Sequence, residues 1–286
     1  METIDQAAFV FQTDSEIVKT VFEQQDNILI EYNNQNNLDI KQCVIYFSSN
    51  NIYYPNTEEV FKKRIVDKNR YEWYETRINN SAKHIFIRDI KKQWYLGGIN
   101  STLNSIDKLA NFLKKETQGY SVITVGSSAG GYAAVLFGSL LKAEKIYSFN
   151  GQFELHSLLS SSSEAIDPII FRERKNPDIT KYYSIKPYIR KPENIFYFCS
   201  TKSSWDSNQL LHIKSIPLNK IKFRTGHHGI PFLKTSLPLV LNMTVDKLTK
   251  LSISTHIPFI FSLNIEGLSA FNNLLKIIWA KKFSKR

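Results

Sequence analysis

Eight short segments rich in β-branched and aromatic residues recur along the chain, and stretches of helical length separate most of them. They are Phe9–Phe11, Ile28–Tyr32, Cys43–Phe47, His84–Ile87, Val122–Val125, Ile146–Phe149, Ile195–Cys199 and Ile221–Phe223. Several carry apolar residues at consecutive positions, as strands do when helices cover both faces of a sheet. The alternation predicts an α/β fold with a mostly parallel central sheet of about eight strands and helices on both faces.

The 286 residues are predicted to form one domain, 1–286, because α/β architectures commonly hold this length without division. Residues 154–192 widen the spacing between two predicted strands and are expected to form a cap or lid over the carboxyl ends of the strands, where open α/β sheets bind ligands. Residues 232–286 are predicted to be a mainly helical extension. Cys43 and Cys199 lie inside predicted strands, so two buried free thiols are expected rather than a disulfide or a zinc site.

Basic residues outnumber acidic ones by 37 to 26, a net charge of +11. Such a surplus favours a polyanionic partner: an acidic glycan, a phosphorylated cofactor, an anionic membrane face or nucleic acid. Nucleic acid is disfavoured because no recognised binding motif is present. The amphipathic stretch 268–280 and the basic tail 281–286 predict either contact with an anionic inner-membrane face or a helix packed on the core. With an acidic residue near the start and no long apolar window, we expect a cytoplasmic protein, with the inner face of the cytoplasmic membrane as the alternative location.

A serine on a tight turn is the strongest chemical signal. The apolar segment 122–125 runs into Gly126-Ser127-Ser128-Ala129-Gly130 and then into a helix-like stretch, 132–141. A serine exposed on a strand-to-helix turn needs small neighbours, because the backbone is strained and other strands approach closely. Ser128 is therefore the predicted nucleophile, with the backbone N–H of Ala129 as an oxyanion donor. The alternative is a plain turn between a strand and a helix.

A serine hydroxyl needs a histidine base and an acid that orients it. Asp206 follows the predicted strand 195–199, and His227 and His228 follow the predicted strand 221–223. We favour His228 as the base, with His227 as the alternative, because the following Gly229 leaves space near a nucleophile. Asp206 is the predicted acid.

The remaining acidic candidates are weaker. Glu193 and Asp178 lie before a strand rather than after one. A second oxyanion donor is expected from the backbone of Ser48 or Ser49, which follow the segment 43–47. The alternative is a turn with no catalytic role. Phosphate-binding loops, zinc-protease helices, EF-hand loops and dinucleotide fingerprints are all missing from the sequence, so no metal site or bound cofactor is expected.

These residues resemble the α/β-hydrolase superfamily over about residues 9–231. More weakly, four blocks resemble serine-triad proteins of bacterial capsule and surface-polysaccharide loci, some of which are similar to capsule O-acetyltransferases that use acetyl-CoA. The blocks are Val44–Ser49, Ile87–Asp89 with Trp94 and Tyr95, Gly126–Gly131 and His228–Pro231. The resemblance implies Ser128 as nucleophile, Asp206 as acid and His228 as base. The doubled histidine and the loop at Ser48, which lacks the usual glycines, depart from the commoner pattern.

The expected chemistry is acyl transfer through an acyl-Ser128 intermediate. The insertion carries basic and aromatic residues suited to coenzyme A phosphates or an acidic glycan. Its predicted ligand-binding residues are Arg172, Arg174, Lys175, Tyr182 and Tyr183. We therefore favour O-acetylation of a bacterial surface or capsular polysaccharide, with acetyl-CoA as donor. The alternatives are a carbohydrate esterase or deacetylase, and a degenerate hydrolase that serves as a scaffold in polysaccharide assembly.

Overall fold

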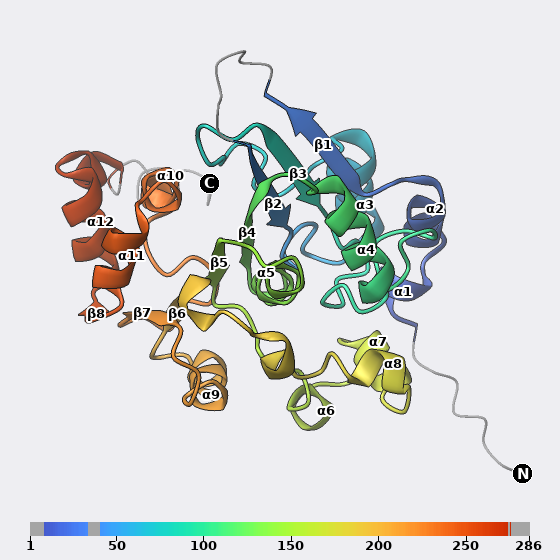
Figure 1. Ribbon diagram of the computed structural model, residues 1–286. Helices are drawn as coiled ribbons and strands as arrows, with labels where there is room; N and C mark the ends of the chain where they lie inside the picture. Colours follow the sequence, from blue (N-terminus) through green and yellow to red (C-terminus); the bar gives the residue numbers. More distant parts are fainter. Residues whose placement is uncertain (1–8, 34–40, 274, 276–286) are drawn as a thin grey trace, which may run out of the picture.

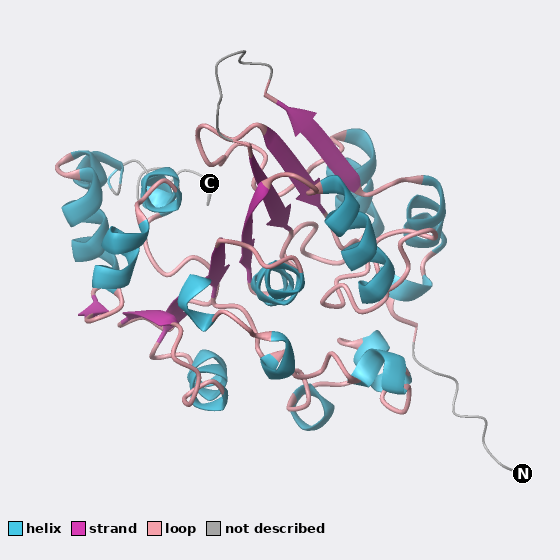
Figure 2. Cartoon of the chain, in the orientation of Figure 1, coloured by secondary structure: helices cyan, strands magenta, loops and turns pink. Residues whose placement is uncertain are grey.

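The computed structural model describes residues 9–33, 41–273 and 275, and these residues contain one eight-stranded sheet (Figures 1 and 2). The strand order is β1-β3-β2-β4-β5-β6-β7-β8. All neighbouring strands are parallel except β1, which runs antiparallel to β3 at one edge. The strands are β1 (Ile28–Tyr32), β2 (Gln42–Phe47), β3 (Lys83–Ile87), β4 (Ser121–Ser127), β5 (Lys145–Phe149), β6 (Ile195–Ser200), β7 (Asn219–Phe223) and β8 (Thr255–His256).

Helices cover both faces of the sheet, as the sequence predicts. Figure 1 shows α4 and α5 on one side of the sheet and α10, α11 and α12 on the other. The α-helices are α1 (Phe11–Asp14), α2 (Glu16–Gln24), α3 (Glu58–Phe61), α4 (Ile106–Glu116), α5 (Ala129–Leu140), α6 (Leu158–Ser161), α7 (Pro168–Arg172), α8 (Pro177–Thr180), α9 (Ser204–His212), α10 (Leu237–Leu241), α11 (Val245–Leu251) and α12 (Pro258–Glu266). The remaining helical segments are the π-helix η1 (Lys62–Asp67) and the 3-10 helices η2 (Lys186–Tyr188), η3 (Pro192–Asn194) and η4 (Lys234–Ser236).

Side-chain alternation along the strands divides the core into two layers. In β6, Tyr197 and Cys199 pack into the layer under α4 and α5, whereas Phe196 and Phe198 pack into the layer under α10 and α11. Successive strand residues point to opposite faces, so a strand covered on both sides needs apolar residues at every position. Helix α5 is buried along most of its length because it lies under β2, β4 and β5 and under the insertion that follows β5.

Seven of the eight predicted strands correspond to β1–β7, and the first predicted strand is wrong. Residues around Phe11 form the short helix α1 instead, where the Asp14 carboxylate accepts a hydrogen bond from the Val10 N–H at 2.8 Å. This local bond between the Asp14 side chain and the backbone at the helix start outweighs the strand preference of three apolar residues. The eighth strand is the two-residue β8, which is too short to leave a pattern in the sequence.

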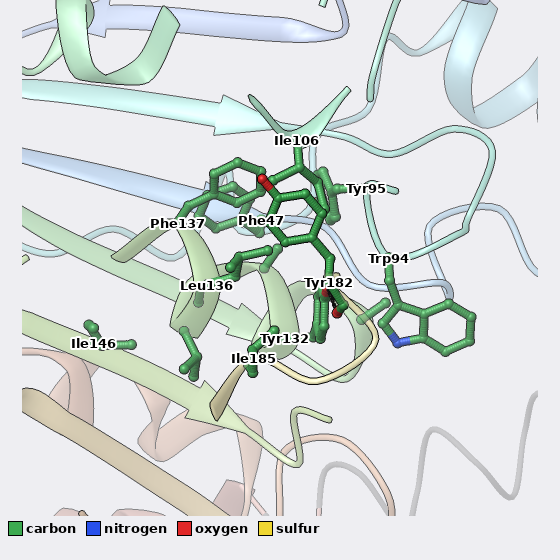
Figure 3. Close-up of a cluster of buried hydrophobic side chains, with 14 of the residues drawn as sticks. Phe47, Trp94, Tyr95, Ile106, Tyr132, Leu136, Phe137, Ile146, Tyr182 and Ile185 are labelled. Carbon is green, nitrogen blue, oxygen red and sulfur yellow. Dashed lines mark hydrogen bonds between the residues drawn. The ribbon is translucent and has the colours of Figure 1, made fainter. Parts of the chain in front are cut away.

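The insertion 154–192 packs against the core as three short helices and two turns rather than standing clear of it. Tyr182 and Ile185 join the cluster around α5, in contact with Tyr132 (Figure 3). The Tyr132 hydroxyl donates to the Tyr182 carbonyl at 2.7 Å, and the Tyr183 hydroxyl donates to the Ile170 carbonyl at 2.7 Å. These bonds fix the insertion as part of the layer that covers α5.

The segment from residue 232 onward is mainly helical over its described part, which runs through α10, α11 and α12. The basic tail predicted to contact a membrane, 281–286, lies outside the described residues, as do residues 274 and 276–280 of the preceding stretch. Within the described chain, none of the helices has the length and apolar character required to cross a bilayer. Cys43 and Cys199 are buried free thiols, and burial raises the pKa of each to about 12.

Candidate active site

Ser128 is the single residue between β4, which ends at Ser127, and α5, which begins at Ala129. Its backbone has φ 54° and ψ −122°, a conformation that side-chain-bearing residues rarely adopt. Two backbone hydrogen bonds hold it there: Ser128 N–H donates to the Phe149 carbonyl at 2.9 Å, and Tyr132 N–H donates to the Ser128 carbonyl at 3.0 Å. A strained serine between a strand and a helix is the geometry of a nucleophile elbow.

Two glycines make this turn possible. A Cβ atom on Gly126 would lie 1.9 Å from the Gly130 carbonyl oxygen, and one on Gly130 would lie 2.3 Å from the Phe47 carbonyl oxygen. Both obstacles are backbone atoms, which cannot rotate away. Only glycine therefore lets β4 turn into α5 while the helix start lies against the end of β2.

The structure brings His228 and Asp206 to Ser128. His228 Nε2 lies 2.8 Å from Ser128 Oγ, and His228 Nδ1 lies 2.8 Å from Asp206 Oδ1. Asp206 is only 1% exposed and lies in the first turn of α9, where its N–H donates to the N-cap hydroxyl of Ser203 at 3.2 Å. The His228 side chain is 29% exposed, so the hydrogen-bonded chain from Asp206 to Ser128 ends at a surface that a substrate can reach.

His228, rather than His227, is the histidine that contacts Ser128. The His227 carbonyl accepts from the Ser200 hydroxyl at 2.6 Å, and its N–H donates to Thr225 Oγ1 at 3.1 Å. The backbone of His227 thus anchors the loop that presents its neighbour. Of the weaker acidic candidates, Asp178 lies in α8 and Glu193 in η3, and neither forms a hydrogen bond or ion pair with His228 among the described residues.

Asn150 is a site residue that the sequence analysis missed. It is fully buried at the end of β5, and its amide nitrogen lies 2.8 Å from the Gly229 carbonyl and 3.3 Å from the His227 carbonyl. Its amide oxygen accepts from the Ser200 N–H at 2.8 Å. One side chain therefore ties the ends of β5 and β6 to both sides of His228. A polar residue directly after an apolar strand was the available signal.

Trp205 also contacts the histidine. Its indole ring stacks on the His228 imidazole, with ring centroids 4.9 Å apart and planes at 23°. Together with the Asp206 hydrogen bond, this stacking restricts rotation of the imidazole.

The backbone N–H groups of Ser48 and Ser49, the two oxyanion donors predicted after β2, donate to different partners. The Ser48 N–H donates to the Ile87 carbonyl of β3 at 3.0 Å, so the prediction that it serves the oxyanion is wrong. The Ser49 N–H donates to Glu72 Oε2 at 2.6 Å, and its hydroxyl lies 2.9 Å from the same oxygen. Burial raises the pKa of Glu72. The Ala129 N–H belongs to the first turn of α5, where backbone donors have no partner within the helix.

The predicted ligand-binding residues of the insertion lie apart from this hydrogen-bonded chain. Arg172 pairs with Asp14 at 2.7 Å and with Glu164 at 2.8 Å. Tyr182 and Tyr183 are 4% and 0% exposed, so they present no ring face on which a sugar could stack, and this part of the prediction is corrected. Arg174 donates to the Phe171 carbonyl within the insertion, and Lys175 is exposed.

Metal ligands are not gathered at this site. Across residues 9–33, 41–273 and 275, no three or more histidine, cysteine, aspartate or glutamate side chains are grouped so that they could hold a metal ion.

The arrangement as a whole is that of the α/β-hydrolase fold. The sheet is mostly parallel with an antiparallel edge strand, and the serine, the acid and the histidine follow β4, β6 and β7 in that chain order. Each side chain stands at the carboxyl end of its strand, the edge at which parallel sheets place their chemistry.

Comparison with protein-family models gives no match, and no curated protein matches the sequence. Solved structures that match include the capsule O-acetyltransferase of Neisseria meningitidis serogroup A, at 15% identity over 68% of this chain and 82% of that one, with a TM-score of 0.47. The S-formylglutathione hydrolase FrmB of Staphylococcus aureus matches at 13% identity over 77% and 87%, with a TM-score of 0.42. An S-formylglutathione hydrolase of Agrobacterium tumefaciens matches at 11% identity over 79% and 88%, with a TM-score of 0.43.

The elbow geometry predicts a large loss of stability in Gly126→Ala. A methyl group 1.9 Å from the Gly130 carbonyl oxygen forces the backbone to shift, so the free energy of unfolding should fall by about 3 kcal/mol. Gly226→Ala is the matched control, because a Cβ there has only ordinary contacts, the nearest at 3.5 Å. Urea denaturation measures both variants. Equal unfolding midpoints for the two would contradict the account of the turn.

The position of Asn150 predicts that Asn150→Asp loses activity. The carboxylate keeps the shape of the amide but removes the donors and faces two carbonyl oxygens, so the loop carrying His228 shifts and kcat/KM for p-nitrophenyl acetate should fall by about 10²-fold. Asn219→Asp is the control, since Asn219 lies at the amino end of β7, away from His228, and donates to the Glu193 carbonyl. Full activity in Asn150→Asp would show that the loop does not depend on this side chain.

Proposed function

We propose that this protein catalyses serine-dependent acyl transfer through an acyl-Ser128 intermediate, and that its reaction is the O-acetylation of a bacterial surface or capsular polysaccharide with acetyl-CoA as donor. The observation that carries the first part is the hydrogen-bonded chain from Asp206 through His228 to Ser128, built on a strained elbow. Such a chain converts a weakly nucleophilic hydroxyl into one that attacks a carbonyl carbon.

In the first half-reaction, Ser128 Oγ attacks the thioester carbonyl while His228 Nε2 accepts the hydroxyl proton. The Asp206 carboxylate accepts a hydrogen bond from His228 Nδ1, which fixes the tautomer and stabilises the imidazolium that forms. The Ala129 N–H donates to the developing oxyanion, aided by the N-terminal end of α5. When the tetrahedral intermediate collapses, the carbon–sulfur bond breaks and His228 gives its proton to the coenzyme A thiolate.

The second half-reaction reverses these roles. A sugar hydroxyl attacks the acetyl group on Ser128, and His228 accepts the proton of that hydroxyl. Collapse of the second intermediate breaks the bond to Ser128 Oγ, which takes the proton back from His228. The products are an O-acetylated sugar and the free enzyme.

Exposed basic side chains after the carboxyl ends of β6 and β7 support an anionic substrate. Lys202 follows β6, Arg224 follows β7 and Lys234 lies beyond the histidine loop, and all three are exposed. The backbone N–H of Lys202 donates to the Thr225 carbonyl at 2.9 Å, and this bond holds together the chain segments that follow β6 and β7. Cations at this edge suit the phosphates of coenzyme A or the charged groups of an acidic glycan.

Hydrolysis of O-acyl groups on a carbohydrate is the second candidate. The specific observation in its favour is the 29% exposure of the His228 side chain, because water can then approach the base. Both reactions share the acyl-Ser128 intermediate and differ only in which nucleophile removes the acyl group.

The proposal predicts a covalent acetyl adduct. Protein mixed with acetyl-CoA and rapidly quenched in acid should gain the mass of one acetyl group, and Ser128→Ala should gain none. Intact-mass spectrometry makes the measurement. An adduct that persists until a polysaccharide is added favours the transferase, whereas one that decays at the same rate without acceptor favours the esterase. If Ser128→Ala is acetylated to the same extent, Ser128 is not the nucleophile.

The exposed basic side chains after β6 and β7 predict a selective change in KM. In the double variant Lys202→Glu and Arg224→Glu, KM for acetyl-CoA should rise about 30-fold, because each cation lost beside a phosphate costs about 1 kcal/mol near the surface and about 1.4 kcal/mol corresponds to a tenfold change. Added salt should shrink the difference. The effect on uncharged p-nitrophenyl acetate should be much smaller. Lys114→Glu with Lys115→Glu, in the last turn of α4, makes the same change in net charge as a control. Equal effects from both pairs would argue against a local binding site.

A further inference from the structure

Glu72 is a carboxyl group beside the site that the reaction above does not use. It lies in the segment between η1 and β3 and is half-buried. Its carboxylate accepts the Ser49 N–H at 2.6 Å, and the Ser49 hydroxyl lies 2.9 Å and 3.1 Å from its two oxygens. Three close contacts to one residue fix the carboxylate on the loop that follows β2.

The direction of the Ser49 N–H follows from the sheet. Along a strand, the backbone N–H groups of successive residues point to opposite neighbours. The Ser48 N–H donates to Ile87 of β3, so the next N–H, that of Ser49, faces β4. The register pairs Phe47 with Gly126 at the last position of the ladder, and Ser49 and Ser128 each follow that pair by two residues. The Ser49 N–H therefore faces the side of β2 on which β4 and the elbow lie, and the Glu72 carboxylate accepts its hydrogen bond.

Trp73 confirms where this segment runs. Its indole nitrogen donates to the Phe47 carbonyl at 3.0 Å, and its ring stacks on Phe149 with centroids 6.0 Å apart. Phe149 is also the residue whose carbonyl accepts the Ser128 N–H. The segment of Glu72 and Trp73 thus crosses the carboxyl ends of β2 and β5, on either side of β4 and Ser128.

We propose that Glu72 is a positioning residue that occupies the second oxyanion donor, the Ser49 N–H, in the free enzyme, so that the carbonyl oxygen of the acyl donor must displace it. This inference rests on the proposed function. A backbone donor aimed at an oxyanion changes the rate by about 10²–10³-fold, so its occupation by an internal carboxylate affects the reaction directly. Acylation then proceeds in two linked events: the carboxylate leaves Ser49, and the substrate oxygen takes its place.

The surroundings of Glu72 fit a carboxylate that moves. Lys234 and Arg70 are the cations that act on it, and Lys234 follows the loop that carries His228. A displaced carboxylate therefore has a positive charge to approach beyond the histidine loop. While it stays on Ser49, it also keeps other anions and water from the donor.

The test compares how fast Ser128 reacts with a fluorophosphonate in wild type, Glu72→Gln and Ser49→Ala. An amide oxygen accepts from Ser49 N–H more weakly than a carboxylate does, so Glu72→Gln should label about tenfold faster. Ser49→Ala keeps the N–H and removes only the hydroxyl contact, so it should label faster by a smaller factor. Glu75→Gln, an exposed glutamate of the same segment, should label at the wild-type rate.

A second readout separates this role from mere support of the loop. A neutral boronic acid forms a tetrahedral anion on Ser128, and its Kd should fall about tenfold in Glu72→Gln, with the urea midpoint recorded alongside. Slower labelling and weaker boronate binding in both Glu72→Gln and Ser49→Ala would show that the contact supports the donor rather than blocks it. Unchanged rates would also overturn the inference. If wild type and every variant fail to label, the proposed function fails, and this inference falls with it.

Discussion

The contact between two backbones, at Gly126 and Gly130, is the constraint on which the rest of the site depends. Because neither residue has a Cβ, α5 starts directly against the ends of β2 and β4, and Ser128 is forced into a conformation that projects its hydroxyl from the carboxyl edge of the sheet. That edge is also where β6 and β7 deliver Asp206 and His228. A side chain at either glycine would separate the start of α5 from the ends of β2 and β4, and Ser128 would lose its orientation.

Buried polar groups, rather than the apolar core, fix the position of the His228 ring and of the loop that carries it. The loop that follows β7 has no regular structure around His228, and loops of this kind are mobile unless something fixes them. Asn150 and Ser200, both fully buried, bind its carbonyl groups, while Trp205 and Asp206 hold the ring itself. Buried amides and hydroxyls are costly unless they are fully hydrogen-bonded, so this network favours one arrangement of the loop over others. The apolar core holds the strands in place, and the polar network fixes the loop that carries His228.

The strands and the order of serine, acid and histidine can be predicted from the sequence, whereas the hydrogen bonds that fix the His228 loop cannot. Seven strands and the order of serine, acid and histidine are readable because each depends on a local pattern: an apolar run, small residues at a turn, a polar residue after a strand. Asn150 and Glu72 are not readable in this way, since their roles arise from contacts with residues about 80 and 23 positions away, at Gly229 and Ser49. The tyrosines of the insertion were assigned to ligand binding because they alternate with basic residues, yet packing against α5 buries them. The first predicted strand is wrong because a local hydrogen bond from the Val10 N–H to the Asp14 carboxylate favours a helical turn there.

The central claim is that Ser128, activated by His228, is the nucleophile of an acyl-transfer site. The most direct measurement is peptide mapping of the protein after reaction with a fluorophosphonate, in wild type and in His228→Ala. The account predicts a phosphonate on Ser128 in wild type, none on the adjacent Ser127, and loss of the adduct in His228→Ala. A phosphonate on Ser127, or equal labelling of Ser128 without the histidine, would contradict it.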